Sequence, residues 1–276
     1  MFSFMDSRQV EEMMLEVMTP DQGREESLDL VPEDPLSLRR SYLTRMQLRQ
    51  GYAFPIEPEA CRPSVEWACA DADWRRTAEY LTLVDDLTQL ERIPAEEGLS
   101  ISRQIDAALG VLRDYDHDLS RSINNLVGCV FLAHVPGLHS VGSGRCLGAI
   151  AFSPRSSWTA LDYASAILHE ALHQALWLCQ IVRRIYSKPI PRLADADSLV
   201  ISPIRRVLRP YNLALHAACV LVEVVHLYRW AGQPLPPDEG SLELLAICIG
   251  ELHEKRENLT GRGREILDQL EEFARP

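Results

Sequence analysis

The sequence lacks three features that would indicate secretion or a membrane. Its seven cysteines form no Cys-x-x-Cys pair, so they predict neither a disulfide framework nor a cysteine zinc site. No apolar run approaches the ~20 residues that span a bilayer. Residues 1–18 carry four acidic side chains and no basic leader, which is not typical of a secretory signal. We therefore expect a cytoplasmic protein.

Basic residues are also scarce. The chain has 28 Lys and Arg against 40 Asp and Glu, a net charge of −12. Nucleic acids and anionic membranes would repel such a chain, so neither is expected as its main partner. Its 276 residues, 46% hydrophobic and 25% charged, are ordinary for a globular protein that buries a core.

Apolar residues recur at helical spacing along most of the chain. This pattern predicts helices over 7–18, 37–50, 71–91, 102–113, 212–230, 242–252 and 262–273. An acidic stretch with prolines, 21–35, indicates an exposed linker. Two short apolar runs bounded by Gly and Pro, 126–132 and 146–152, predict strands joined by a loop over 136–144.

These elements predict a predominantly helical α+β fold. A long helix should begin after a capping Ser157 and run to about Tyr186. It should pack on a second apolar helix, 212–230, above a small β-sheet. We expect residues 1–60 to form a helical arm and linker, and 61–276 to form one mostly helical metal-binding domain with its motif core at 145–230.

The long helix contains the run His169-Glu170-Ala171-Leu172-His173. Residues four apart lie on one face of a helix, so both imidazoles can bind one divalent metal. The neighbouring Glu170 can handle a proton on metal-bound water. His169 and His173 are therefore predicted metal ligands, with Glu170 as the residue that acts beside them.

A catalytic metal usually has a third protein ligand and an open position. The compact arrangement with a Gly and a third His directly after the motif is absent, because residues 174–180 contain neither. The helix over 212–230 offers His216, which would give a three-His site, or Glu223, which would give a two-His, one-Glu site. Asp195 and Asp197, in the intervening loop, are weaker candidates.

Three arginines, Arg205, Arg206 and Arg209, stand just before the second apolar helix. Cations at a helix N-terminus oppose the helix dipole, so another interaction should hold them. Guanidinium groups favour carboxylates through two-pronged hydrogen bonds. An arginine beside a His-ligated metal would suit an oxygenase that holds a 2-oxo acid chelating iron.

From the motif helix to Trp230, the segment resembles the HExxH-motif domain of peptide natural-product pathways. That family is described as iron(II)- and 2-oxoglutarate-dependent peptide β-hydroxylases. It pairs a His-Glu-x-x-His helix with a Pro-Trp-Arg-x-x-Pro-Arg-Pro stretch and a Leu-His-Gly-x-Tyr helix. The counterparts here, in the same order and spacing, are Pro203, Arg205, Arg209, Pro210, Leu215 and His216. Four positions depart from the pattern: Ile204, Leu208, Ala217 and Cys219.

The resemblance covers roughly residues 145–230 and favours His216 over Glu223 as the third ligand. It implies that His169, His173 and His216 hold Fe(II), and that Arg205 or Arg209 pairs with the distal carboxylate of 2-oxoglutarate. Glu170 would orient a ligand or water. The implied reaction is hydroxylation of an amino-acid or peptide side chain in natural-product biosynthesis.

Two other functions stay open. The chain could be a zinc peptidase or amidase, with Zn²⁺ on His169, His173 and either Glu223 or His216, and Glu170 as general base. It could also be a binding protein with a structural or vestigial metal site. The sequence does not choose among a peptide, a carrier-bound amino acid and a free amino acid as the substrate.

Overall fold

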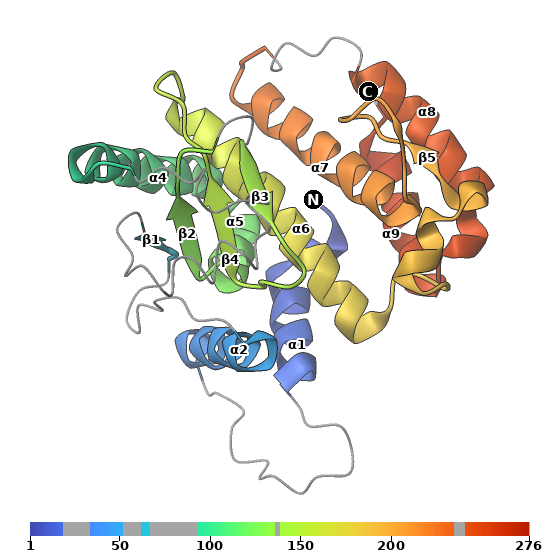
Figure 1. Ribbon diagram of the computed structural model, residues 1–276, viewed down its shortest axis with the longest axis horizontal. Coiled ribbons are helices and arrows are strands. Elements are labelled where there is room, and N and C mark those ends of the chain that lie inside the picture. Colours follow the sequence, from blue (N-terminus) through green and yellow to red (C-terminus); the bar gives the residue numbers. More distant parts are fainter. Residues whose placement is uncertain (19–33, 52–61, 67–92, 136–138, 235–240, 276) are drawn as a thin grey trace, which may run out of the picture. The chain divides into compact units, whose positions relative to one another are not determined.

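The computed structural model describes residues 1–18, 34–51, 62–66, 93–135, 139–234 and 241–275 (Figure 1). Contacts divide the chain into two compact units, Asp6–Leu178 and Met1–Met5 together with Cys179–Pro276. Three predictions lie wholly or mostly outside the described residues: the linker over 21–35, the helix over 71–91 and the domain boundary at residue 60.

The predicted fold class, predominantly helical α+β, is confirmed. The helices of the first unit are α1 (Ser7–Met18), α2 (Pro35–Gln50), α4 (Ala95–Tyr115), α5 (His117–Leu126) and most of α6 (Ala160–Arg183). The second unit contains α7 (Tyr211–Trp230), α8 (Ser241–Glu254) and α9 (Gly261–Phe273). Its short 3-10 helices are η1 (Ser3–Met5), η3 (Ile190–Ala194), η4 (Ala196–Ser198) and η5 (Arg256–Asn258).

Side-chain caps fix several helix ends in the first unit. Asp34 accepts hydrogen bonds from the backbone N–H groups of Leu36 and Ser37 at the start of α2. Gly51 ends α2 in the left-handed region, with φ of 76°, which a glycine adopts without strain. Asp116 ends α4 and also caps α5, so these two helices follow one another without a loop.

The first unit holds a four-stranded sheet in the order β1-β2-β4-β3. Its strands are β1 (Ser64–Glu66), β2 (Cys129–Leu132), β3 (Ser140–Gly142) and β4 (Ala149–Phe152). β2 pairs in parallel with β1 and β4, whereas β3 pairs antiparallel with β4 and forms an edge. Every residue of β2 and β4 is buried, as in parallel strands covered on both faces.

Both predicted strands exist, but each is shorter than its apolar run. Residue 126 ends α5, and β2 begins only at Cys129. Residues 146–148 form a turn before β4. The loop predicted over 136–144 is wrong in part, because β3 lies within it. This strand is three residues long, too short for an alternating pattern to be recognised.

The predicted ends of the motif helix are also corrected. α6 begins at Ala160, directly after Thr159 rather than after Ser157, because Thr159 and Asp162 have the spacing of a capping box. The helix ends at Arg183, before the predicted Tyr186. Arg184 has φ of 47°, and the Gln180 side chain accepts hydrogen bonds from the backbone after it.

In the second unit, α7 is connected to both the preceding hairpin and the helices that follow. β5 (Val200–Ile201) and β6 (Leu208–Arg209) form a two-stranded antiparallel hairpin that leads directly into α7. The Tyr211 hydroxyl donates to the carbonyl of Leu252 on α8. The backbone N–H of Ile201 donates to Glu251, which ties the hairpin to α8.

By length and composition, α7 is apolar enough to cross a membrane, contrary to the expectation that no run is long enough. Its most apolar window is 72% buried within the protein. A core helix passes the same test, so α7 is weak support for a membrane span. The five cysteines of the described residues are free thiols and buried.

Candidate metal centre

The imidazoles of His169 and His173 converge on one face of α6. Their Nε2 atoms lie 3.2 Å apart, and their ring centroids lie 4.9 Å apart. Two nitrogens that each lie ~2.1 Å from a metal, at ~90–110° to one another, would be about 3.0–3.4 Å apart. The imidazole pair therefore has the separation that a shared divalent metal requires.

Glu170 completes a group of three side chains whose ligand atoms lie within 4.8 Å of one another. Its Oε1 lies 3.8 Å from His169 Nε2. The Glu170 side chain is 3% exposed, whereas that of His169 is 31% exposed. A metal at the imidazoles would thus be reachable from solvent while the carboxylate beside it stays covered.

The Glu170 carboxylate takes its hydrogen bonds from β3. The Ser140 hydroxyl donates to Oε1 at 2.6 Å, and the backbone N–H of Gly142 donates to the same carboxylate. Burial raises the pKa of Glu170, and the charge of His169 with these two hydrogen bonds opposes the rise. A buried carboxylate of raised pKa beside a metal is suited to accept or hold a proton.

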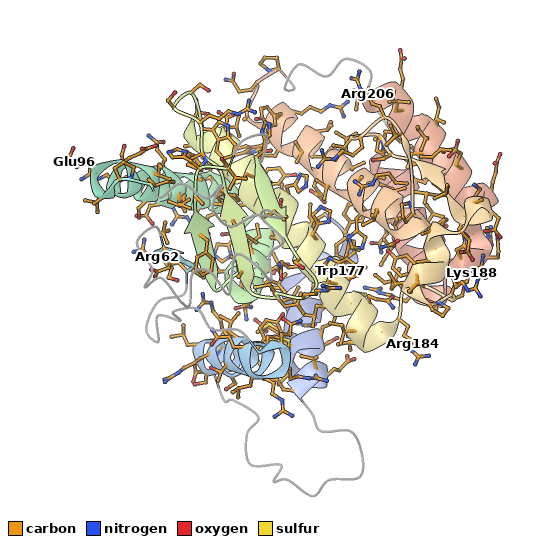
Figure 2. The ribbon with its side chains drawn as sticks, viewed as in Figure 1. Arg62, Glu96, Trp177, Arg184, Lys188 and Arg206 are labelled. Atoms are coloured by element: carbon orange, nitrogen blue, oxygen red, sulfur yellow. The ribbon has the colours of Figure 1, made fainter. Side chains whose placement is uncertain are left out.

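Two glycines let β3 and its following turn approach α6. A Cβ on Gly142 would lie 2.9 Å from Glu170 Oε2 and 3.2 Å from Gln174 Nε2. A Cβ on Gly144 would lie 2.8 Å from the indole of Trp177, a residue of α6 labelled in Figure 2. Any larger residue at either position would have to displace a side chain of the motif helix.

Gln174 and Gln50 hold the strands in place around this contact. Gln174, one turn beyond Glu170, accepts from the backbone N–H of Gly148 and donates to the carbonyl of Ala149. Gln50, at the end of α2, donates to the carbonyl of Gly144 and accepts from Leu147. The two Gln174 bonds fix α6 against the start of β4, and the two Gln50 bonds fix the end of α2 against the turn after β3.

Both candidates for the third ligand lie on α7, in the second unit. His216 is 1% exposed, and burial lowers its pKa to about 3, so its imidazole is neutral, the form that binds metals. Glu223 is equally buried, and its Oε1 lies 3.8 Å from the amino group of Met1. The choice of His216 stays a prediction, because His169 and His173 belong to the first unit.

The predicted cosubstrate arginines lie on or beside the hairpin before α7. Arg205 is exposed, and Arg209 on β6 is partly buried. Burial and the nearby charge of Arg205 lower the pKa of Arg209. The weaker metal candidates have other partners: Asp195 pairs with Arg192, and Asp197 with Lys188.

Ser140 and Gly142 did not emerge from sequence reasoning as functional residues. They lie some thirty residues before Glu170, in a stretch read as a loop. The one signal was the small-residue run Ser140-Val141-Gly142-Ser143-Gly144, which allows a close backbone approach. That run does not say which helix it approaches.

We compared the chain with known protein families and with curated proteins. No family model matches the sequence, and no curated protein matches it. The family resemblance of residues 145–230 therefore stays a prediction.

Proposed function

We propose that the protein is a non-haem Fe(II)- and 2-oxoglutarate-dependent hydroxylase that acts on an amino-acid or peptide side chain, in the cytoplasm, as part of natural-product biosynthesis. The substrate class and pathway come from the resemblance of residues 145–230 to the HExxH-motif peptide β-hydroxylases. Support for the chemistry comes from the imidazole pair on α6 and from the arginines of the β5–β6 hairpin.

His169 and His173 would hold the iron, with His216 as the proposed third ligand. Imidazole ligands with open positions suit ferrous iron. When bound, iron and 2-oxoglutarate supply oxidative decarboxylation coupled to hydroxylation of a C–H bond. Glu170, covered and bonded to β3, would orient water or a ligand without coordinating the metal itself.

The observation that carries the choice of an oxygenase is that Arg205 and Arg209 stand on one hairpin, close enough for the charge of Arg205 to lower the pKa of Arg209. Burial and the charge of Arg205 both raise the energy of the charged form of Arg209. Within the described residues, neither has a carboxylate oxygen within 4.0 Å, although Arg192, Arg262 and other arginines of the same unit do. A bound dicarboxylate would relieve this repulsion through bidentate hydrogen bonds.

Spectroscopy under anaerobic conditions tests the proposal without knowledge of the substrate. A 2-oxo acid that chelates Fe(II) gives a visible charge-transfer absorption, which we expect when 2-oxoglutarate is added to the iron-loaded protein. His169→Ala should abolish the band. The proposal is contradicted if iron-loaded protein shows no band at saturating 2-oxoglutarate and releases no succinate in air.

Glu170 favours a second candidate, a zinc peptidase or amidase. A buried carboxylate 3.8 Å from a ligand imidazole is well placed to act as the general base of a hydrolase. The two functions differ in their requirements, because a hydrolase works with zinc and needs neither O₂ nor 2-oxoglutarate. Peptide or amide cleavage by zinc-loaded protein under strict anaerobiosis would favour the hydrolase.

A further inference from the structure

Ser140 stands out among the residues around the imidazole pair because its contact is specific and its burial is incomplete. Its hydroxyl donates to Glu170 Oε1 at 2.6 Å, while its side chain stays partly exposed. A hydroxyl that is not needed to fill the core can be removed without leaving a buried cavity. Its contribution is therefore the hydrogen bond rather than packing.

The orientation of the Glu170 carboxylate is set from β3. The Ser140 hydroxyl and the Gly142 N–H both reach it from this strand. The approach of His169 Nε2, at 3.8 Å, is too long for a hydrogen bond. A buried carboxylate needs such donors, and their directions fix the rotamer in which it is held.

We infer that Ser140 is a positioning residue: its hydroxyl holds the Glu170 carboxylate beside the metal position and keeps it out of the set of ligands. Gly142 makes this possible, because any Cβ there would collide with the same carboxylate. The inference rests on the metal site of the proposed function. It does not depend on the choice between an iron oxygenase and a zinc hydrolase.

Cobalt(II) binding to the full chain tests this role without any assay of activity. The dissociation constant of Co(II) and its visible absorption spectrum are measured for wild type, Ser140→Ala, Glu170→Gln and the double variant. Ser140→Ala should change the dissociation constant by about tenfold or more, in the same direction as Glu170→Gln, because residues that orient ligands have effects of this size. When Glu170 is already Gln, adding Ser140→Ala should not change the dissociation constant of Co(II) any further.

Two further variants separate positioning from general stability. Ser140→Thr keeps the hydroxyl and should restore the wild-type Co(II) spectrum and affinity. Ser143→Ala removes a hydroxyl just after β3 that, among the described residues, accepts a hydrogen bond from the backbone of Arg145, so it should behave as wild type. All variants should be folded at the temperature of the Co(II) titration, which thermal unfolding checks.

The inference is overturned if Ser140→Ala binds Co(II) with wild-type affinity and spectrum, or if its effect adds in full to that of Glu170→Gln. If the proposed metal site itself were wrong, a different result would show it: His169→Ala would bind Co(II) with the same affinity as the wild type. Failure of the oxygenase proposal alone would leave every Co(II) result unchanged.

Discussion

The backbone of α6 sets the positions of the His169 and His173 imidazoles. One helical turn places the two Nε2 atoms 3.2 Å apart, with His169 still about a third exposed. Little reorganisation is needed for both nitrogens to bind one ion. The affinity of the site should therefore depend on these two side chains far more than on their neighbours.

Replacing His169 or His173 with Ala should abolish stoichiometric metal binding and leave the helical content unchanged. Each change removes one ligand from a partly exposed position of α6 and leaves unchanged the side chains that bond to the sheet, Glu170 and Gln174. Metal content by elemental analysis and far-ultraviolet circular dichroism check this. His134→Ala, which alters a histidine paired with Glu97, serves as the control. Full metal content in both ligand variants would contradict the assignment.

Arg205→Ala or Arg209→Ala should raise the 2-oxoglutarate concentration needed for half-saturation by about tenfold or more. A hydrogen bond between charged groups contributes about 1.5–3 kcal/mol. Titration of 2-oxoglutarate into the anaerobic iron-loaded variants measures the change. Arg206→Ala, between the two, should leave the requirement close to that of wild type. Unchanged titrations in both variants would remove these arginines from the site.

The contact between β3 and α6 connects the sheet to the motif helix. It depends on the small size of Gly142, whose Cβ position faces Glu170 and Gln174. Gly142→Ala should lower the free energy of unfolding by about 1–3 kcal/mol, because overpacking forces side chains from their rotamers. It should also weaken metal binding, because Glu170 must move.

Gly110→Ala is the matched control for this substitution. Gly110 lies inside α4, and a Cβ there would meet nothing within 4 Å. Ala should therefore raise the free energy of unfolding by about 0.5–1 kcal/mol, through its higher helix propensity. Denaturant unfolding of both variants is the measurement. Equal effects of the two substitutions would mean that the contact at Gly142 is not tight.

A hydrogen-bonded pair joins α1 to α5. Both the backbone N–H and the hydroxyl of Ser7 donate to Asp118. Burial alone would raise the pKa of Asp118, but the bonds from Ser7 and the charge of Arg121 lower it overall. The folded state therefore binds the proton more weakly than the unfolded state, whose Asp has a pKa of about 3.9.

This stabilisation is present above the unfolded pKa and is lost as the pH falls through the folded one. Asp118→Asn should lower the free energy of unfolding at pH 7 and make it fall less steeply below about pH 5. Urea unfolding at several pH values measures both effects. If Asp118→Asn were as destabilising at pH 3 as at pH 7, the hydrogen bonds between Ser7 and the charged Asp118 would not be the source of the stabilisation.

Most helices of the described residues could be predicted from apolar spacing, because each buries one face along several turns. The helix predicted over 102–113 is α4, which begins earlier at Ala95, and α5 was not predicted. α1, α2, α7, α8 and α9 begin and end within two residues of their predicted ranges. The short strands β1 and β3 could not be predicted, because three residues are too few to show the alternation of apolar and polar side chains that marks a strand. The same limit hid Ser140 and Gly142, whose role depends on which helix β3 approaches.

For the whole molecule, the motif and the other proposed site residues belong to different compact units. α6 itself passes from one unit to the other after Leu178. Spacing along the sequence could predict the imidazole pair, because a single helix determines it. The third ligand and the arginines depend on tertiary packing between elements far apart in sequence, which no local pattern determines. The sequence pattern offered His216 and Glu223 as alternatives and three arginines as carboxylate partners, and only the family resemblance chose among them.

The central claim is that one metal and 2-oxoglutarate bind together and drive hydroxylation. The most direct measurement is succinate formation by anaerobically iron-loaded protein, given 2-oxoglutarate and then O₂, compared with His169→Ala and with zinc-loaded protein. We predict that, of these three proteins, only the iron-loaded wild type forms succinate. Any substrate that speeds up succinate formation should gain one oxygen atom. Equal succinate from His169→Ala, or substrate turnover by zinc-loaded protein without O₂, would contradict the account.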